Sequence, residues 1–344
     1  MKYLFFFVEW ISTGNMTVAR VLHTESTLRS GTVLAVGGGA NSVFYNTAEL
    51  YDPSTGVWTG TGNMSIGRVL HTASILTDGT VLVTGGNYNN IALNTVELYD
   101  PSTEIWTITG NMSTARFYHT ASMLENGKVL VTGGADSSSN VVNTAELYDS
   151  STGKWTTTGN MTTSRLGHNA SILKNGKVLV PGGLSNTGLL NSAELYDPST
   201  GIWKSVGHMS TGRLYHTQST LANGTVLVAG GSNSSIYLDS AELYDPSTEI
   251  WITTGSMNTA RALHTSSILT NGQVLVAGGG NTVSVLNSAE LYDSSTELWT
   301  NTANMTTERG YHTASVLTNG EVLVTGETPD GVGYLNSAEL YQPY

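Results

Sequence analysis

The sequence contains no cysteine among its 344 residues. A disulfide framework, a thiol nucleophile and a cysteine-ligated metal site are therefore excluded. Positive charge is also scarce, with 14 lysine and arginine residues against 26 aspartate and glutamate residues, so no basic patch is available to displace counterions from nucleic acid. No apolar stretch is long enough to span a membrane. We therefore expect neither nucleic acid nor a membrane as a partner.

Only 12% of the residues are charged, whereas Ser, Thr, Asn and Gly are abundant. No segment shows the 3.6-residue period of a helix. The apolar run from Leu4 to Val8 is short for a signal peptide, and Glu9 and Trp10 stand where small residues would precede a cleavage site. We interpret this run as a strand. The composition leaves the compartment open, with an extracellular location weakly favoured.

Tryptophan recurs every 48 or 49 residues, which reveals an internal repeat. The seven positions are Trp10, Trp58, Trp106, Trp155, Trp203, Trp251 and Trp299. The other landmarks of the unit keep the same spacing, so the repeat extends through essentially the whole chain.

Each repeat divides into four short strand-like segments. In the third repeat the first segment, 119–124, is followed by an Asn-Gly pair at 126–127, which predicts a two-residue type I′ hairpin turn. A Val-Leu-Val segment at 129–131 indicates a buried central strand and ends at a Gly-Gly pair at 133–134. An Ala-Glu-Leu-Tyr segment forms the third strand, and a turn beginning with Asp leads to the fourth, which holds the tryptophan.

The Gly pair, the tyrosine shortly before the tryptophan and the tryptophan itself resemble the kelch repeat. The resemblance implies an all-β fold, a seven-bladed kelch β-propeller with four antiparallel strands per blade and with the first strand lining a central channel. We expect a single domain, 1–344, whose blades cover about 20–60, 68–108, 116–157, 165–205, 213–253, 261–301 and 309–342 plus 5–12. The last unit lacks a fourth strand, so the N-terminal strand should complete blade seven and close the ring. Blade seven departs from the repeat, with Gly326-Glu327 in place of the Gly pair and Gln342 in place of Asp.

Three charged or titratable residues recur in every repeat. The arginines are Arg20, Arg68, Arg116, Arg165, Arg213, Arg261 and Arg309. The histidines, three residues later, are His23, His71, His119, His168, His216, His264 and His312, and the third strands carry Glu49, Glu97, Glu146, Glu194, Glu242, Glu290 and Glu339. Residues common to all blades favour a structural role, as Arg–Glu ion pairs and as hydrogen-bonded imidazoles. The alternative is that the seven arginines are ligand-binding residues that converge on an anion at the channel mouth.

Three repeats add a tyrosine directly before the histidine, at Tyr118, Tyr215 and Tyr311. The resulting Arg-x-Tyr-His segments resemble those of galactose oxidase-like proteins, in which the Tyr and His are copper ligands. The resemblance makes these tyrosines candidate ligand-binding residues and His119, His216 and His312 candidate metal ligands. Those enzymes also need a Tyr–Cys crosslink and a further C-terminal domain, and this sequence has no cysteine and ends at blade seven. We therefore expect no cofactor and no catalytic residue, with a metal ion on the histidines as the open alternative.

The repeats differ most between their second and third strands. These loops cover 39–45, 87–93, 135–142, 184–190, 232–238, 280–286 and 328–335, and they should emerge on one face. Their aromatic residues Phe44, Tyr45, Tyr88, Tyr237 and Tyr334 suit contact with a protein or a sugar. The favoured function is a monomeric, non-enzymatic scaffold that binds a protein or glycan on this face. An enzyme related to carbohydrate or metal chemistry, and a structural module of a longer protein, are the alternatives.

Overall fold

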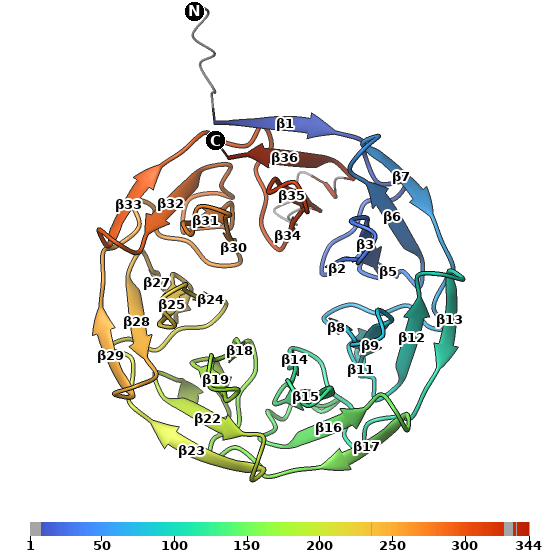
Figure 1. Cartoon of the computed structure of the whole chain (residues 1–344), viewed down its shortest axis with the longest axis horizontal. Coiled ribbons are helices and arrows are strands. Elements are labelled where there is room, and N and C mark those ends of the chain that lie inside the picture. Colours follow the sequence, from blue (N-terminus) through green and yellow to red (C-terminus); the bar gives the residue numbers. More distant parts are fainter. Residues whose placement is uncertain (1–7, 235, 327–332, 335, 344) are drawn as a thin grey trace, which may run out of the picture.

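The computed structural model describes residues 8–234, 236–326, 333–334 and 336–343, and in this part of the chain there is no helix. Seven antiparallel sheets of four strands stand around a central axis like blades (Figure 1). In the six blades that are continuous in sequence, the first strand lies innermost and the fourth lies at the rim. The predicted seven-bladed propeller is therefore confirmed. No helix among the described residues is available to cross a membrane.

The blades follow one another along the chain. Blade 1 contains β2 (Thr24–Thr27), β3 (Val33–Val36), β6 (Ala48–Asp52) and β7 (Val57–Gly60), and blade 2 contains β8 (Thr72–Ile75), β9 (Val81–Thr84), β12 (Val96–Asp100) and β13 (Ile105–Ile108). Blade 3 contains β14 (Thr120–Met123), β15 (Lys128–Thr132), β16 (Ala145–Asp149) and β17 (Lys154–Thr157), and blade 4 contains β18 (Ser171–Ile172), β19 (Val178–Pro181), β22 (Ala193–Asp197) and β23 (Ile202–Val206). Blade 5 contains β24 (Thr217–Thr220), β25 (Val226–Ala229), β28 (Ala241–Asp245) and β29 (Ile250–Thr253), and blade 6 contains β30 (Thr265–Ile268), β31 (Val274–Ala277), β32 (Ala289–Asp293) and β33 (Leu298–Asn301).

Blade 7 joins the two ends of the chain. It contains β34 (Thr313–Val316), β35 (Val322–Thr325), β36 (Ala338–Gln342) and, at the rim, β1 (Glu9–Thr13). As the sequence predicted, the N-terminal strand completes this blade: β1 pairs antiparallel with β36, and Trp10 lies opposite Tyr341. Residues 5–7 of the predicted strand lie outside the described residues. The closure pairs two strand edges that would otherwise be open.

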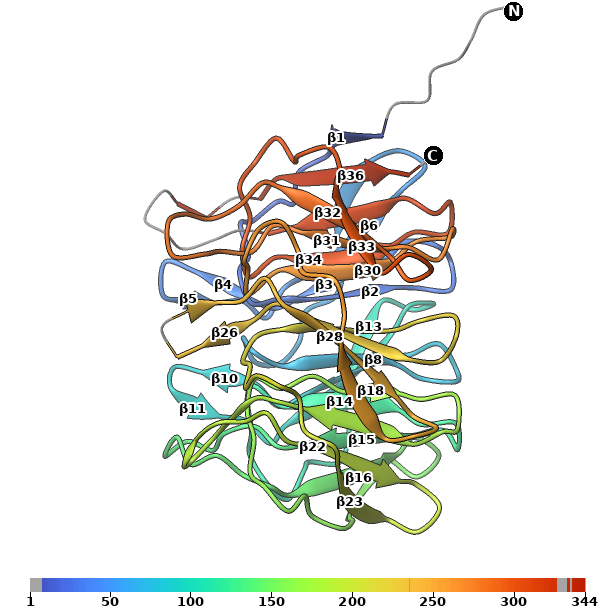
Figure 2. The same cartoon turned by 90° about the vertical axis from the view of Figure 1, so that its left-hand side faces the viewer.

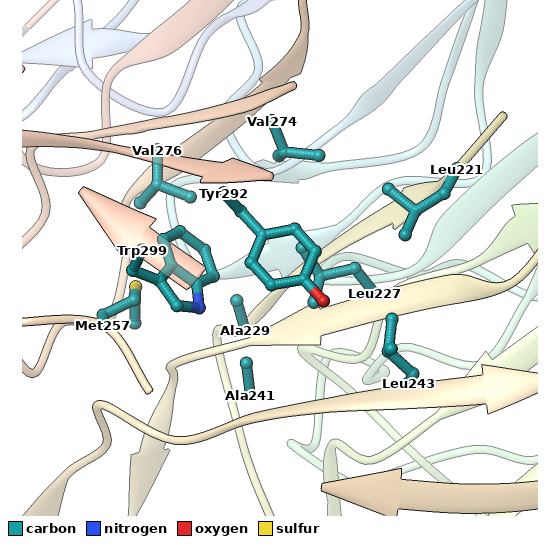
Figure 3. Close-up of a cluster of buried hydrophobic side chains, with 10 residues drawn as sticks. All are labelled: Leu221, Leu227, Ala229, Ala241, Leu243, Met257, Val274, Val276, Tyr292 and Trp299. Carbon is teal, nitrogen blue, oxygen red and sulfur yellow. The ribbon is translucent and has the colours of Figure 1, made fainter. Parts of the chain in front are cut away.

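The hydrophobic core lies between the blades rather than at the axis. Figure 3 shows one of these layers, in which Leu227 and Leu243 of blade 5 face Val276, Tyr292 and Trp299 of blade 6. Because every blade is covered on both faces, the second strand is apolar at successive positions. Its alternate side chains enter the two neighbouring layers, which explains the Val-Leu-Val segments of the sequence.

The hairpin between the first two strands differs from the expected type I′ turn. In blade 3 the amide of Gly127 donates to the carbonyl of Leu124 at 3.0 Å, and the amide of Leu124 donates to Lys128 O at 2.8 Å. Gly127 has a φ of 82°, whereas Asn126 is not in the left-handed region. This is a three-residue loop with a bulge at glycine, in which the Asn126 side chain accepts from the Lys128 amide. An Asn-Gly pair suits both turns, and the prediction of a two-residue loop was wrong by one residue.

The loops between the second and third strands project from one face of the ring (Figure 2). Four of them form small hairpins of two-residue strands: β4 (Gly39–Ala40) with β5 (Val43–Phe44), β10 (Asn87–Tyr88) with β11 (Ile91–Ala92), β20 (Leu184–Ser185) with β21 (Gly188–Leu189), and β26 (Ser232–Asn233) with β27 (Ile236–Tyr237). We call this face the loop face. In blades 1 to 6 the segment after the arginine pairs with the start of the loop in the same blade, for example Val21 with Gly39, so these arginine segments approach the loop face.

Candidate functional site

Each of the seven arginines forms a buried ion pair with the glutamate of the third strand. Arg116 donates from Nη2 to Glu146 Oε1 at 2.9 Å, and the side chains are 0% and 2% exposed. The other six pairs have the same geometry, with N–O distances of 2.8–3.0 Å. The structure therefore brings together the arginine and glutamate series that the sequence placed about 30 residues apart.

The arginines also bind backbone carbonyls. Arg116 Nη1 donates to Gly133 O at 2.8 Å and to Thr144 O at 3.0 Å, so one guanidinium spans the two ends of the loop between β15 and β16. Glu146 accepts a second bond from the Ser113 amide, which fixes the linker from the previous blade. Burial lowers the pKa of Arg116, while Glu146 opposes the shift.

The candidate arginines are therefore not exposed on the channel. A ligand could reach the guanidinium of Arg116 only if the Glu146 pair and the carbonyl bonds were broken. This geometry favours the structural interpretation of the arginine series over an anion site.

The histidines link neighbouring blades. His119 lies in blade 3, and its Nε2 is 3.0 Å from Thr72 Oγ1 and 3.2 Å from Thr84 Oγ1 in blade 2. Burial, with a smaller effect of the Arg116 charge, lowers the pKa of His119 to about 3. Burial and a nearby arginine lower the pKa of His216 and His312 to about 3 as well. These imidazoles are neutral at physiological pH.

The three candidate metal ligands are not brought together. His119, His216 and His312 belong to blades 3, 5 and 7, and no group of three His, Asp or Glu side chains within the described residues could hold one metal ion. The imidazoles of His119 and His312 contact threonines of the preceding blade, as expected for structural histidines rather than for metal ligands.

The residue before each histidine forms a collar at the channel. Its members are Leu22, Leu70, Tyr118, Gly167, Tyr215, Leu263 and Tyr311, and all have φ between 55° and 59°. Six backbone bonds of 3.2–3.4 Å connect successive members, for example from the Tyr118 amide to Leu70 O and from the Gly167 amide to Tyr118 O. This repeated left-handed residue is a second interblade link that the sequence pattern did not reveal.

The candidate tyrosines are members of this collar. The rings of Tyr118 and Tyr215 are 5.9 Å apart between centroids, and both tyrosines are half-buried. Burial is the main cause that raises the pKa of Tyr118, Tyr215 and Tyr311, so all three are protonated at neutral pH. They occupy the same place as leucine or glycine in the other blades, as expected for packing residues.

The central channel contains a cavity between the blades. This cavity of about 440 Å³ is lined by the first strands and includes His71, His119 and Glu25. Glu25 was not among the candidates, although it breaks a repeat position occupied by Ala73 and Ala121. Its carboxylate accepts from Ser315 Oγ at 2.9 Å and from Thr325 Oγ1, so it connects blade 1 to blade 7.

The loop face has its own hollow. A pocket of about 410 Å³ lies between the loops of blades 5 and 6 and is lined by Tyr237, Leu263, Thr282, Val283 and Tyr311, among others. Tyr311 therefore borders both the channel and the loop face. The aromatic residues predicted on the loops differ in their exposure. Tyr88 is exposed, and Phe44 packs against it with ring centroids 5.5 Å apart.

The remaining loop aromatics are half-buried. The guanidinium of Arg20 lies over the ring of Tyr45 at 5.5 Å from its centroid, which gives this tyrosine a structural contact beneath the loop face. Tyr237 and Tyr334 are also only partly exposed.

The fold and its repeated Arg–Glu pairs define a seven-bladed propeller of the kelch type. Residues 70–265 and 118–327 match the family described as the KLHDC2/KLHL20/DRC7 Kelch-repeats domain, and residues 27–65 match the Kelch motif. The chain belongs to the Kelch-repeat family. No curated protein matches the sequence.

Two solved structures share the fold. One is described as "Novel fungal alcohol oxidase with catalytic diversity among the AA5 family, in complex with copper"; it has a TM-score of 0.81 and 17% identity over 98% of this chain and 76% of that chain. The other, "Structure of YjhT", has a TM-score of 0.66 and 18% identity over 83% of this chain and 98% of that chain. At these identities the similarity concerns the fold alone.

Proposed function

We propose that this protein is a non-enzymatic scaffold that binds an uncharged protein surface through its loop face. The observation that carries the proposal is a set of exposed aliphatic side chains at the loop tips. Val43, Ile91, Ile236 and Val283 are 52%, 57%, 64% and 88% exposed and come from four different blades. A rigid ring that presents apolar loop tips fits the general anatomy of a protein-binding face.

The chemistry of the loops supports an uncharged partner. Within the six loops from 39–45 to 280–286, Asp136 is the one charged residue, and the rest are apolar, aromatic or neutral polar. The arginines near this face are paired beneath it and add no free positive charge. We therefore expect affinity to change little with ionic strength, because few charges would be screened.

The pocket between the loops of blades 5 and 6 provides an anchor point on this face. Its volume of about 410 Å³ has room for a large side chain, and Tyr237, Tyr311 and Val283 offer aromatic and aliphatic contacts. A partner would insert an apolar residue there while its surroundings contact the loop tips.

The alternative is an enzyme of the galactose oxidase type or another carbohydrate- or metal-related enzyme. The Arg-x-Tyr-His segments motivate it, and the likeness to the alcohol oxidase fold does not add support because the identity is 17%. The sequence has no cysteine for the crosslinked cofactor of those enzymes. The scaffold is therefore the better supported function.

A selection from a random displayed peptide library against the intact protein tests the proposal. We expect peptides with aromatic and aliphatic residues and little charge, whose affinity is lost in an Ile91→Asp/Ile236→Asp/Val283→Asp variant. The matched control is Ile105→Asp, because Ile105 on the rim strand β13 is 56% exposed, close to the 57% of Ile91. The proposal is contradicted if the peptides still bind the loop variant but no longer bind the Ile105→Asp control. If the protein binds neutral oligosaccharides and no peptides, the loop face is assigned to glycans instead.

A further inference from the structure

The ring has seven junctions between neighbouring blades, and the junction between blades 4 and 5 lacks side-chain hydrogen bonds that the other six share. On the channel side, a threonine of one blade contacts Nε2 of the next histidine at six junctions, with distances of 2.9–3.1 Å. Between blades 4 and 5 the threonine position is occupied by Asn169, whose side-chain amide donates to the backbone carbonyl of His216 instead. Nε2 of His216 is buried without a partner, while the other six histidines each keep an Nε2 partner.

The inner strand of blade 4 is also shortened. Strand β18 has two residues, whereas the innermost strands of the other six blades have four. By repeat position Asn169 and Pro181 correspond to the paired Thr72 and Thr84 of blade 2, and proline has no amide hydrogen to donate to a neighbouring strand. In blade 2 the corresponding residue is Thr84, which pairs with Thr72 and supports His119. Blade 4 therefore has both a shorter inner strand and no hydroxyl group for His216.

The outer side of the same junction has a second defect. At the other six junctions a threonine hydroxyl is 2.7–3.0 Å from the hydroxyl of the third-strand tyrosine. Val206 takes the threonine position here, and the hydroxyl of Tyr244 is buried without a partner. The indole nitrogen of Trp251, on the adjacent strand, also has no partner, a feature shared only by Trp58 among the seven tryptophans. Polar links are thus missing at both ends of one junction.

Apolar packing and surface contacts still hold this junction. Val206 and Leu195 of blade 4 pack with Tyr244 of blade 5 in one buried cluster. The collar bond from the Tyr215 amide to Gly167 O is present at 3.3 Å. An ion pair between Lys204 and Glu249, 2.6 Å long, crosses the outer surface, where exposed pairs contribute little and are screened by salt.

We propose that the ring opens first between blades 4 and 5, which makes this junction the conformational hinge of the propeller. Buried polar groups without partners destabilise the closed junction, and opening lets water hydrate them. On opening, the other six junctions lose the threonine–histidine and threonine–tyrosine hydrogen bonds that are already absent between blades 4 and 5. The hinge lies away from the pairing of the two chain ends in blade 7, which is the seam that topology alone would make the weakest (Figure 1).

Amide hydrogen exchange on the full chain tests the hinge. The amides of Gly183 and Tyr215 bond across the junction of blades 4 and 5, and those of Gly231 and Leu263 are their counterparts between blades 5 and 6. We expect the first pair to exchange on the order of tenfold faster than the second pair. Equal protection of the two pairs, or fastest exchange between β1 and β36, would overturn the proposal.

Two double variants test the hinge from opposite sides, one by adding the missing hydroxyl groups to the junction of blades 4 and 5 and one by removing them from the junction of blades 5 and 6. Asn169→Thr with Val206→Thr restores the missing hydroxyl groups, and we expect the exchange of the Gly183 and Tyr215 amides to slow about tenfold. Thr217→Asn with Thr254→Val copies the defect to the junction of blades 5 and 6, because these residues contact His264 and Tyr292 there. We expect faster exchange at Gly231 and Leu263 in that variant. If the second variant does not fold, the first still decides: unchanged exchange at Gly183 and Tyr215 contradicts the hinge.

Discussion

Nη2 of Arg116 lies 2.9 Å from Oε1 of Glu146, at a place where neither side chain has more than 2% of its surface exposed. A buried ion pair costs desolvation energy, which its hydrogen bonds must offset. Here the offset includes two carbonyl bonds from the arginine and an amide bond to the glutamate. The pair therefore fixes the path of the chain around the Gly133-Gly134 bend of blade 3.

Replacing Arg116 with alanine should destabilise the protein strongly, because Glu146 would stay buried without its counter-charge. We expect a loss of about 3–5 kcal/mol in the free energy of unfolding. Urea unfolding followed by tryptophan fluorescence measures it.

The control for this change is Lys128→Ala, which removes an exposed pair with Asp149 at 3.5 Å. Its effect should stay below about 1 kcal/mol. An Arg116→Ala variant of normal stability that loses a ligand would restore the arginines as ligand contacts.

Acid should unfold the protein through its histidines. Burial holds the pKa of His119 at about 3 in the folded state, below its ordinary value of 6.5, so between these values the unfolded state binds the extra proton. Stability is then highest above pH 6.5 and falls by about 1.4 kcal/mol per pH unit per histidine of this kind as the pH drops toward 3.

His119→Gln tests this dependence. We expect a shallower fall in the free energy of unfolding between pH 6.5 and 4.5, measured by urea unfolding at several pH values. The exposed His208 provides the control, since His208→Gln leaves the buried histidines in place. Equal slopes in the His119 variant and the parent protein would contradict the prediction.

Two glycines with positive φ should respond differently to alanine. Gly85 has a φ of 59°, and a Cβ atom there would lie 2.6 Å from Arg116 O and 2.8 Å from His119 Cε1. Gly127 has a φ of 82° with open space around a Cβ atom. Gly127→Ala should cost about 1–2 kcal/mol from backbone strain alone. Gly85→Ala adds a clash with the backbone, so we expect it to lower the free energy of unfolding at least twice as much. Thermal or urea unfolding of the two variants measures the difference.

The closing strand should contribute strongly to stability through Trp10. Its indole donates to Ala303 O at 2.8 Å and its ring centroid lies 5.1 Å from that of Tyr341. Trp10→Ala should lower the free energy of unfolding by about 3–5 kcal/mol and increase the rate of proteolysis near blade 7. Ile11→Ala, at a half-exposed neighbouring position, should change proteolysis little, and equal sensitivity of the two variants would argue against the role of Trp10.

Much of the fold followed from regular spacing in the sequence. The tryptophan period fixed the number of blades, and the incomplete last repeat indicated the pairing of β1 with β36. The Asn-Gly pair at 126–127 predicted a turn at the right place but of the wrong type, because the pair suits both loop lengths and only the backbone bonds of Leu124 distinguish them.

The candidate site was harder to predict from the sequence. The kelch resemblance placed Arg116 near the channel mouth, but the sequence could not say which way the side chains of Arg116 and Tyr118 turn. The structure buries Arg116 against Glu146, while Tyr118 joins a collar of left-handed residues. A φ value is a property of the folded backbone, so a Leu, Tyr or Gly at the same repeat position gave no signal of the collar.

The sequence by itself determined the seven blades, their strand order and the face that carries the variable loops, since these depend on periodic patterns and short-range turns. Only the tertiary structure decided which side chains remain available. The arginine side chains are buried and paired within their own blades, whereas the side chains of Ile91 and Val283 are exposed at the loop tips. The same reason applies to Asn169 and Val206, which occupy positions held by threonine in the other repeats. The groups that they leave without a partner, in His216 and Tyr244, belong to the next blade, so the effect is visible only in the folded ring.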